Sequence, residues 1–306
     1  MLFGYENQES QKRIDKMKKN EVLLSSVIIL ILWVFLWCEA YATEDSLEFL
    51  VGLEKDTFLV SEPIWLDISA TNIGEEEIRI LPLVLTCMEC LQVILINSKA
   101  DTLYYHGIVD DVTKPPTGYL TYPGKTRSNC VNLLEGFGEK LDGFGIRHFL
   151  EPDKYSIIAT YGGIIKASGI EFEVSVPKED EREAYDLLRD GYDYHIQFKI
   201  AKLNEKLEEL VRKYPNSVYA DLAHYEMAYW ADDPAEAEEY GTELLFTYPN
   251  SRFTRFAFWQ ILRSKTHNEQ IQFLKDTIKK LPKHTRAFEW AQGSLEALEG
   301  RESPGK

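Results

Sequence analysis

Apolar residues recur at two different periods along the chain, and the period changes near Pro177. Before Pro177 apolar and polar residues alternate, as from Ile64 to Thr71, where every second residue is aliphatic or alanine. This alternation is typical of a strand with one face in a core and the other in water. The predicted strands cover residues 47–53, 64–71, 78–80, 91–96, 103–105, 128–134, 155–161 and 170–176. Short strands without intervening helices predict an antiparallel β-sandwich over residues 43–177.

After Pro177 the period becomes helical. The run from Lys178 to Glu183 is entirely charged, and its acidic residues suit the positive end of a helix dipole. Leu203, Leu207 and Leu210 then recur at the spacing of one helical face. We therefore predict an α-helical domain over residues 178–299, followed by a disordered tail over residues 300–306.

A short sequence repeats within the helical part. Tyr214-Pro215-Asn216-Ser217 recurs 34 residues later as Tyr248-Pro249-Asn250-Ser251, and a looser copy, Leu281-Pro282-Lys283-His284, follows after 33 more. Proline cannot continue a helix, and asparagine or serine caps the next one. A period of 34 residues is typical of stacked helix pairs.

Two segments resemble known families. Residues 62–74 (EPIWLDISATNIG) resemble the second-strand signature of bacterial immunoglobulin-like domains, and residues 150–157 (LEPDKYSI) are similar to their L-x-P-G-x-Y-x-I motif, with Asp153 in place of glycine. This resemblance implies an immunoglobulin-like fold for residues 45–177 and no particular activity.

The repeat is similar to tetratricopeptide repeats of bacterial envelope proteins over residues 192–298. The residues that carry the resemblance are the Y-P-N-S turn, Tyr219-Ala220, Ala223 and Ala237. The resemblance implies an architecture of tetratricopeptide-like (TPR-like) helical repeats.

The N-terminus has the parts of a secretory signal peptide. Lysines and an arginine precede an uncharged, largely apolar run of 17 residues, 22–38, and Ala40-Tyr41-Ala42 follows it. We predict a signal peptide over residues 1–42 and an exported protein, periplasmic or extracellular. Met17-Lys18-Lys19 is typical of a bacterial start, so translation from Met17 is a further hypothesis. The alternative is an uncleaved anchor formed by residues 22–38, which would be the only membrane contact.

The acidic composition narrows the classes of partner. The chain has 34 Lys and Arg against 50 Asp and Glu, a formal charge of −16. Sequence-independent binding to nucleic acid depends on clustered basic residues, so we expect no nucleic-acid partner.

Catalytic and ligand-binding motifs are not apparent. The six histidines are scattered, and the G-x-x-x-x-G-K match from Gly300 to Lys306 lacks the Ser/Thr and the helix that a phosphate site needs. We therefore predict no catalytic residue, no cofactor and no metal site.

Cysteine usage predicts one structural bridge. Cys87-x-x-Cys90 falls within a stretch that the pattern predicts as strand, and Cys130 is the third cysteine after residue 42. For an exported chain we expect a disulfide between Cys130 and either Cys87 or Cys90, with one thiol left over. A bridge between Cys87 and Cys90 is the alternative.

Aromatic residues are dense in the helical part. Most are expected to pack between helix pairs, but some would line a groove for a partner, with Tyr225, Tyr229, Phe256 and Trp259 as the candidates. The sequence thus predicts a non-catalytic interaction or scaffold protein of the cell envelope whose helical repeats bind a protein or peptide. The alternative is an envelope enzyme or a protease-inhibitor-like module, with its activity in the sandwich loops over residues 106–148.

Overall fold

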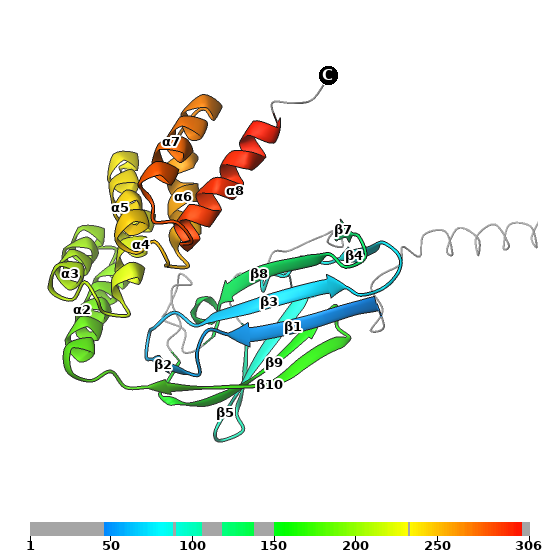
Figure 1. Ribbon diagram of the computed structural model, residues 1–306. Helices are drawn as coiled ribbons and strands as arrows, with labels where there is room; N and C mark the ends of the chain where they lie inside the picture. Colours follow the sequence, from blue (N-terminus) through cyan, green and yellow to red (C-terminus); the bar gives the residue numbers. More distant parts are fainter. Residues whose placement is uncertain (1–45, 88–89, 106–117, 138–149, 232, 302–306) are drawn as a thin grey trace, which may run out of the picture.

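The computed structural model of the chain describes residues 46–87, 90–105, 118–137, 150–231 and 233–301. Strands come first and helices second, as the sequence predicted (Figure 1). We call residues 46–175 the strand region and residues 179–301 the helical region. The predicted signal peptide and anchor lie outside the described residues. The last helix continues to Arg301, so residues 300 and 301 are helical and do not belong to the tail predicted from residue 300.

The strand region contains two larger sheets. The first is antiparallel, with the order β1-β3-β8. The second has the order β2-β10-β9-β5-β6, in which only the β2–β10 pair is parallel. A separate two-stranded ribbon pairs β4 with β7. The bounds are β1 Leu47–Leu53, β2 Thr57–Leu59, β3 Trp65–Asn72, β4 Ile78–Ile80, β5 Leu91–Asn97, β6 Thr102–Tyr104, β7 Tyr119–Thr121, β8 Thr126–Asn132, β9 Asp153–Tyr161 and β10 Ile165–Ser175.

One hydrophobic core joins the two larger sheets. In β3 the alternating residues Leu66, Ile68 and Ala70 are buried, as the pattern predicted. Phe49 of the first sheet stacks on Tyr161 of the second, with 5.3 Å between ring centroids. The alternation therefore places one face of each sheet against the other.

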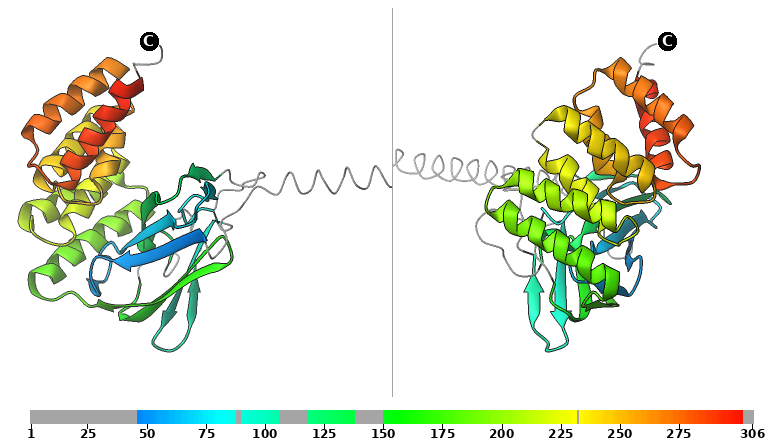
Figure 2. Two further views of the ribbon diagram at one scale, coloured as in Figure 1. Left: turned by 45° about the vertical axis from the view of Figure 1, so that its right-hand side comes forward. Right: turned by 90° about the vertical axis from the view of Figure 1, so that its left-hand side faces the viewer.

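Seven helices make up the described helical region, and Figures 1 and 2 show them stacked in chain order. They form a second core in which Leu203, Leu207 and Leu210 are fully buried. Gly191 of α2 lies where two helices approach closely, because an added Cβ would lie 3.2 Å from Leu203 Cδ1. The bounds are α2 Glu179–Ile196, α3 Ile200–Lys213, α4 Ala220–Trp230, α5 Pro234–Thr247, α6 Thr254–Leu262, α7 His267–Lys280 and α8 Arg286–Arg301.

The repeated proline turns lie against each other in space. The Tyr248 hydroxyl of the second turn donates to the carbonyl of Pro215 in the first, at 2.9 Å. The Ala287 amide, just after the third turn, donates to the carbonyl of Pro249 in the second, also at 2.9 Å. The sequence period therefore corresponds to a physical stacking of successive units.

None of the helices in the described ranges combines the length and the apolar character that a membrane span requires.

Candidate interaction surface

The proline turns also join the helical region to the strand region. Phe253, four residues after Pro249, meets Trp65 of β3 edge-on, with 5.2 Å between ring centroids. Alternation along β3 places Trp65 on the face opposite the sheet core, where the pattern predicted contact with water. It is only 8% exposed because that face packs against the helices.

Tyr219 occupies the same position after the first proline turn and makes a second contact. Its hydroxyl donates to the carbonyl of Val60 at 2.7 Å, and the whole side chain is buried. Burial raises the pKa of Tyr219, so the hydroxyl stays protonated and remains a donor.

Arg252, beside Phe253, provides a charged contact between the regions. Its guanidinium donates to both carboxylate oxygens of Asp67, with Nη2 at 2.7 Å from Oδ2, and its Nε donates to Glu54 at 3.0 Å. The arginine side chain is only 6% exposed, whereas both carboxylates remain about half exposed. Hydrogen bonds to Asp67 raise the pKa of Arg252 further, so the charge is permanent.

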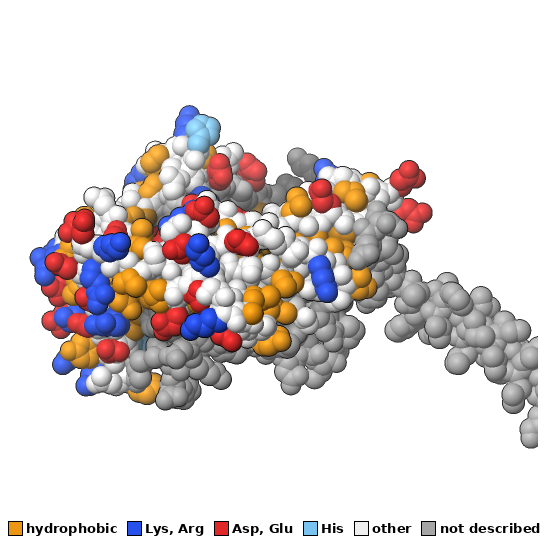
Figure 3. All heavy atoms as spheres, turned by 90° about the horizontal axis from the view of Figure 1, so that it is seen from below, with side chains coloured by type: hydrophobic (Ala, Val, Ile, Leu, Met, Phe, Trp, Pro, Cys, Tyr) orange, Lys and Arg blue, Asp and Glu red, His pale blue; other side chains and the backbone are white. Residues whose placement is uncertain are grey.

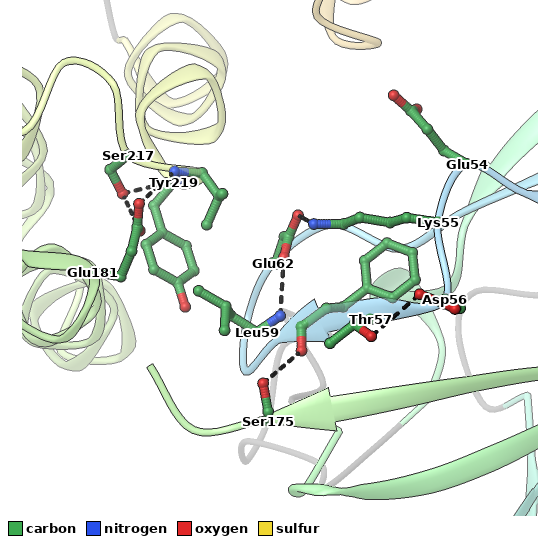
Figure 4. A network of polar contacts seen from close by, with 12 residues as sticks. Glu54, Lys55, Asp56, Thr57, Leu59, Glu62, Ser175, Glu181, Ser217 and Tyr219 are labelled. Carbon is green, nitrogen blue, oxygen red and sulfur yellow. Dashed lines mark hydrogen bonds and ion pairs between the residues drawn. The ribbon is translucent and has the colours of Figure 1, made fainter. Parts of the chain in front are cut away.

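A polar network completes the junction (Figure 4). Glu62 accepts from the Leu59 amide at 2.9 Å and pairs with Lys55 on the strand side. Glu181 of α2 accepts from the Ser217 hydroxyl at 2.7 Å on the helical side. Burial raises the pKa of Glu62, and the hydrogen bond and charge of Lys55 oppose that rise. The carboxylates thus fix the loops on both sides of Tyr219.

Three of the four predicted groove residues form one cluster beside this junction. Tyr225 stacks on Phe253 at 4.5 Å, and its ring lies 5.6 Å from Phe256 and 5.8 Å from Tyr229. Trp259 lies one turn beyond Phe256 on α6, and Arg263 lies over its ring at 5.2 Å. We call Tyr225, Tyr229, Phe256 and Trp259 the aromatic stripe.

The aromatic stripe runs from a buried end to an exposed end. Phe253 is 1% exposed, whereas Phe256, Tyr229 and Trp259 are 38%, 49% and 57% exposed. Elsewhere the charged surface is mixed: in Figure 3 basic and acidic side chains are interspersed over the helical end of the face seen from below. The stripe therefore presents large aromatic side chains to solvent on a rigid base.

An open groove of about 830 Å³ lies on another side of the junction, where β9 and β10 meet the start of α2. Lys154, Lys178 and Glu181 are among its lining residues. Glu181 is already hydrogen-bonded to Ser217, so it serves the junction.

The titratable residues of the described ranges do not converge. No group of three His, Cys, Asp or Glu there could hold a metal ion. His195, His224, His267 and His284 belong to different helices or turns, and His106 and His148 lie outside the described residues. Burial lowers the pKa of His224 to about 4, so this histidine is a neutral core residue at pH 7.

The cysteines differ from the first predicted pairing. Cys87 is bonded to Cys90, the alternative, and Cys130 is a free thiol in β8. The pair does not lie within a strand, because β5 begins only at Leu91. The Cys90 and Leu91 amides both donate to the Cys87 carbonyl, so the bridge closes a tight turn.

Comparison with known proteins adds weak likenesses only. No family model matches the chain, and no curated protein matches it. A β-glucosidase from Listeria innocua in complex with gluconolactone is 15% identical, with a TM-score of 0.25, over 42% of this chain and 16% of that one. The alkylpurine DNA glycosylase AlkC of Pseudomonas fluorescens, bound to DNA containing an abasic site analog, is 9% identical, with a TM-score of 0.28, over 43% and 31%.

The sporulation control protein Spo0M of Bacillus subtilis is 13% identical, with a TM-score of 0.22, over 47% of this chain and 55% of that one. This chain therefore spans less than two thirds of each of the three proteins. Likenesses of this size carry no argument about its fold or its function.

Proposed function

We propose that this chain is an exported, non-catalytic interaction protein of the cell envelope. In this account an immunoglobulin-like sandwich supports a TPR-like helical array, and the array binds a protein or peptide partner. The immunoglobulin-like and TPR-like assignments are supported by the sequence motifs quoted above. They are also supported by the two sheets that face each other across one core and by the contact between proline turns 34 residues apart. The apolar run over residues 22–38 supports export.

The aromatic stripe is the observation that carries the proposal. A single exposed aromatic needs no explanation, but three neighbouring ones on two adjacent helices form a surface of the kind found at interface hot spots. Two ring contacts join it to the junction: Tyr225 stacks on Phe253, and Phe253 meets Trp65. A surface held this way loses little conformational entropy when a partner binds.

The flanking charges indicate the chemistry of the partner. Arg252, Arg255 and Arg263 all lie on or next to α6, the helix that carries Phe256 and Trp259. Arg252 is engaged by Asp67 and Arg255 donates to Asn129, which leaves the exposed Arg263 beside Trp259 of the stripe. We therefore propose a segment with apolar anchors and nearby carboxylates as the partner.

Paired surface variants test this proposal. Envelope proteins are captured with the wild-type chain, with Tyr229→Ser/Trp259→Ser, and with the control Ile164→Ser/Phe198→Ser, which changes exposed apolar residues outside the stripe. We expect the stripe variant to lose at least tenfold of the captured partner while its thermal unfolding midpoint is unchanged, and the control to keep it. Equal capture by all three proteins would contradict the proposal. Deleting the helical region is a poorer test because it would expose Trp65.

A further inference from the structure

Apolar side chains gather at the end of the strand region where the chain enters β1. Ile73, Tyr119, Leu120 and Tyr122 are 56%, 56%, 46% and 58% exposed, and we call these four residues the rim. They belong to the turn after β3, to β7, and to the turn that follows β7. Figure 1 shows β4 and β7 at the end of the sheets opposite to α2 and α3.

The rim is built on an ordered frame. Asn72 is fully buried, and its amide nitrogen donates to the carbonyls of Glu76 at 2.8 Å and Thr121 at 2.9 Å. Its side-chain oxygen accepts from the Gly74 amide at 3.0 Å. One side chain therefore ties the turn after β3 to β7, and the rim side chains are exposed although the backbone that carries them is fixed.

The N-terminal segment reaches the fold at this same place. The carbonyl of Ser46 accepts from the Ile73 amide at 3.0 Å. Only residues 39–45 separate Ser46 from the apolar run over residues 22–38. Seven extended residues span at most about 25 Å, so an apolar run held in a membrane keeps Ser46, and Ile73 beside it, within about that distance of the membrane.

We propose that, in the chain that retains residues 22–38, the rim rests on the surface of a lipid bilayer. Tyrosine rings suit the boundary between headgroups and acyl chains, because one end is apolar and the other polar, and Ile73 and Leu120 add aliphatic contacts. Lys125 and Arg127, both exposed beside the rim, can donate to lipid phosphates.

Nearby acidic residues specify the kind of lipid. Glu75, Glu76 and Glu77 are exposed in the turn next to Ile73 and outnumber the two basic residues. Anionic lipids would be repelled by these carboxylates, so the proposed surface is zwitterionic. In Figure 1 the helices α4 and α6, which carry the aromatic stripe, lie on the side of the molecule away from β4 and β7, so this orientation keeps them away from the bilayer.

Hydroxyl-radical footprinting of the full chain in phosphatidylcholine vesicles tests the rim. A protease site inserted between Ala42 and Thr43 provides the reference, because the same protein is measured before cleavage and after recovery from the supernatant. We expect oxidation of Tyr119 and Tyr122 to be at least threefold slower before cleavage. Tyr229 and Trp259, with comparable exposure on the helices, are the internal controls and should not change.

If the cleaved chain stays on the vesicles and Tyr119→Ser/Tyr122→Ser releases it, the rim binds by itself and the proposal also stands. Equal oxidation rates at Tyr119 and Tyr122 before and after cleavage would overturn it. Equal protection of Tyr229 and Trp259 would overturn it too, because the contact would then not be specific to the rim.

Discussion

The indole ring of Trp65 meets the ring of Phe253 edge-on at the junction of the strand and helical regions. Both residues are buried, and the Phe253 ring also stacks on the ring of Tyr225. The aromatic stripe and the junction are thus one packed unit. A change at the junction should therefore affect the stability of both regions.

Truncation of either ring tests this coupling. Phe253→Ala and Trp65→Ala should each lower the free energy of unfolding by about 3–5 kcal/mol, the usual cost of removing a buried aromatic. A double-mutant cycle between them should give a coupling of about 0.5–1.5 kcal/mol, measured by denaturant unfolding. Phe253→Ala combined with Phe172→Ala in the strand core is the control and should be additive. Additivity at the Trp65–Phe253 pair would show that the junction does not form as described.

Because Arg252 donates to both carboxylate oxygens of Asp67, we expect this position to require the planar guanidinium group of arginine. Arg252→Ala should destabilise the protein by about 1–3 kcal/mol, because the hydrogen bonds of a largely buried guanidinium to Asp67 and Glu54 are lost. Arg252→Lys should recover less than half of that loss, since an ammonium group cannot donate in parallel to both oxygens of Asp67. Arg212→Ala, at an exposed residue of α3 away from the junction, should change the unfolding midpoint little. If Arg252→Lys were as stable as the wild type, the two parallel hydrogen bonds to Asp67 would not be what stabilises this contact.

His224 predicts a loss of stability in acid. Burial lowers its pKa from 6.5 to about 4, so the unfolded chain binds more protons than the folded chain between these pH values. The free energy of unfolding therefore decreases as the pH is lowered through this range. At about 1.4 kcal/mol per pKa unit, the loss approaches about 3 kcal/mol by pH 4, and it is absent above pH 6.5. Denaturant unfolding of wild type, His224→Phe and the exposed control His284→Asn across this range would measure it. Only His224→Phe should flatten the profile, and an unchanged slope would refute this assignment.

The cysteine arrangement predicts a defined thiol count. In the chain from residue 43 onward, non-reducing mass spectrometry after alkylation should find Cys130 modified and a peptide with Cys87 joined to Cys90. Because the closed loop is short, reduction should cost only about 2 kcal/mol of stability. A bridge that includes Cys130 would restore the first pairing that the sequence suggested.

Local pattern was sufficient for most of the regular elements. Alternation located β1, β3 and β9, and the proline turns located the starts of α4, α6 and α8, because these signals depend on residues close together in the chain. The strands β2 and β7 were missed, whereas β4 and β6, which are equally short, were predicted. The stretch before Leu91 was predicted as strand because apolar residues are dense there, but the Cys87–Cys90 turn occupies its end.

The contacts between the strand region and the helical region could not be predicted from the pattern of apolar residues. Trp65 and Asp67 share the outward face of β3, and alternation alone treats that face as solvated. A tryptophan on an otherwise polar face was the available signal, since large aromatics are seldom left in water. Its partners, Phe253 and Arg252, follow a repeat turn far along the chain, and no local rule pairs positions at that separation. The groove candidates were found because they recur at helical spacing, but their connection to Trp65 through Phe253 needed the fold.

Site-specific photo-crosslinking in cells tests the central claim most directly. A benzoylphenylalanine placed at Trp259 in the full chain should, on irradiation, give an adduct of discrete mass with one envelope protein, and the same protein should be captured from Phe256. The same probe at Phe198, a more exposed aromatic outside the stripe, should not capture it. If Phe198 captures the same protein equally well, or if neither stripe position captures any, the aromatic stripe is not a partner-binding surface.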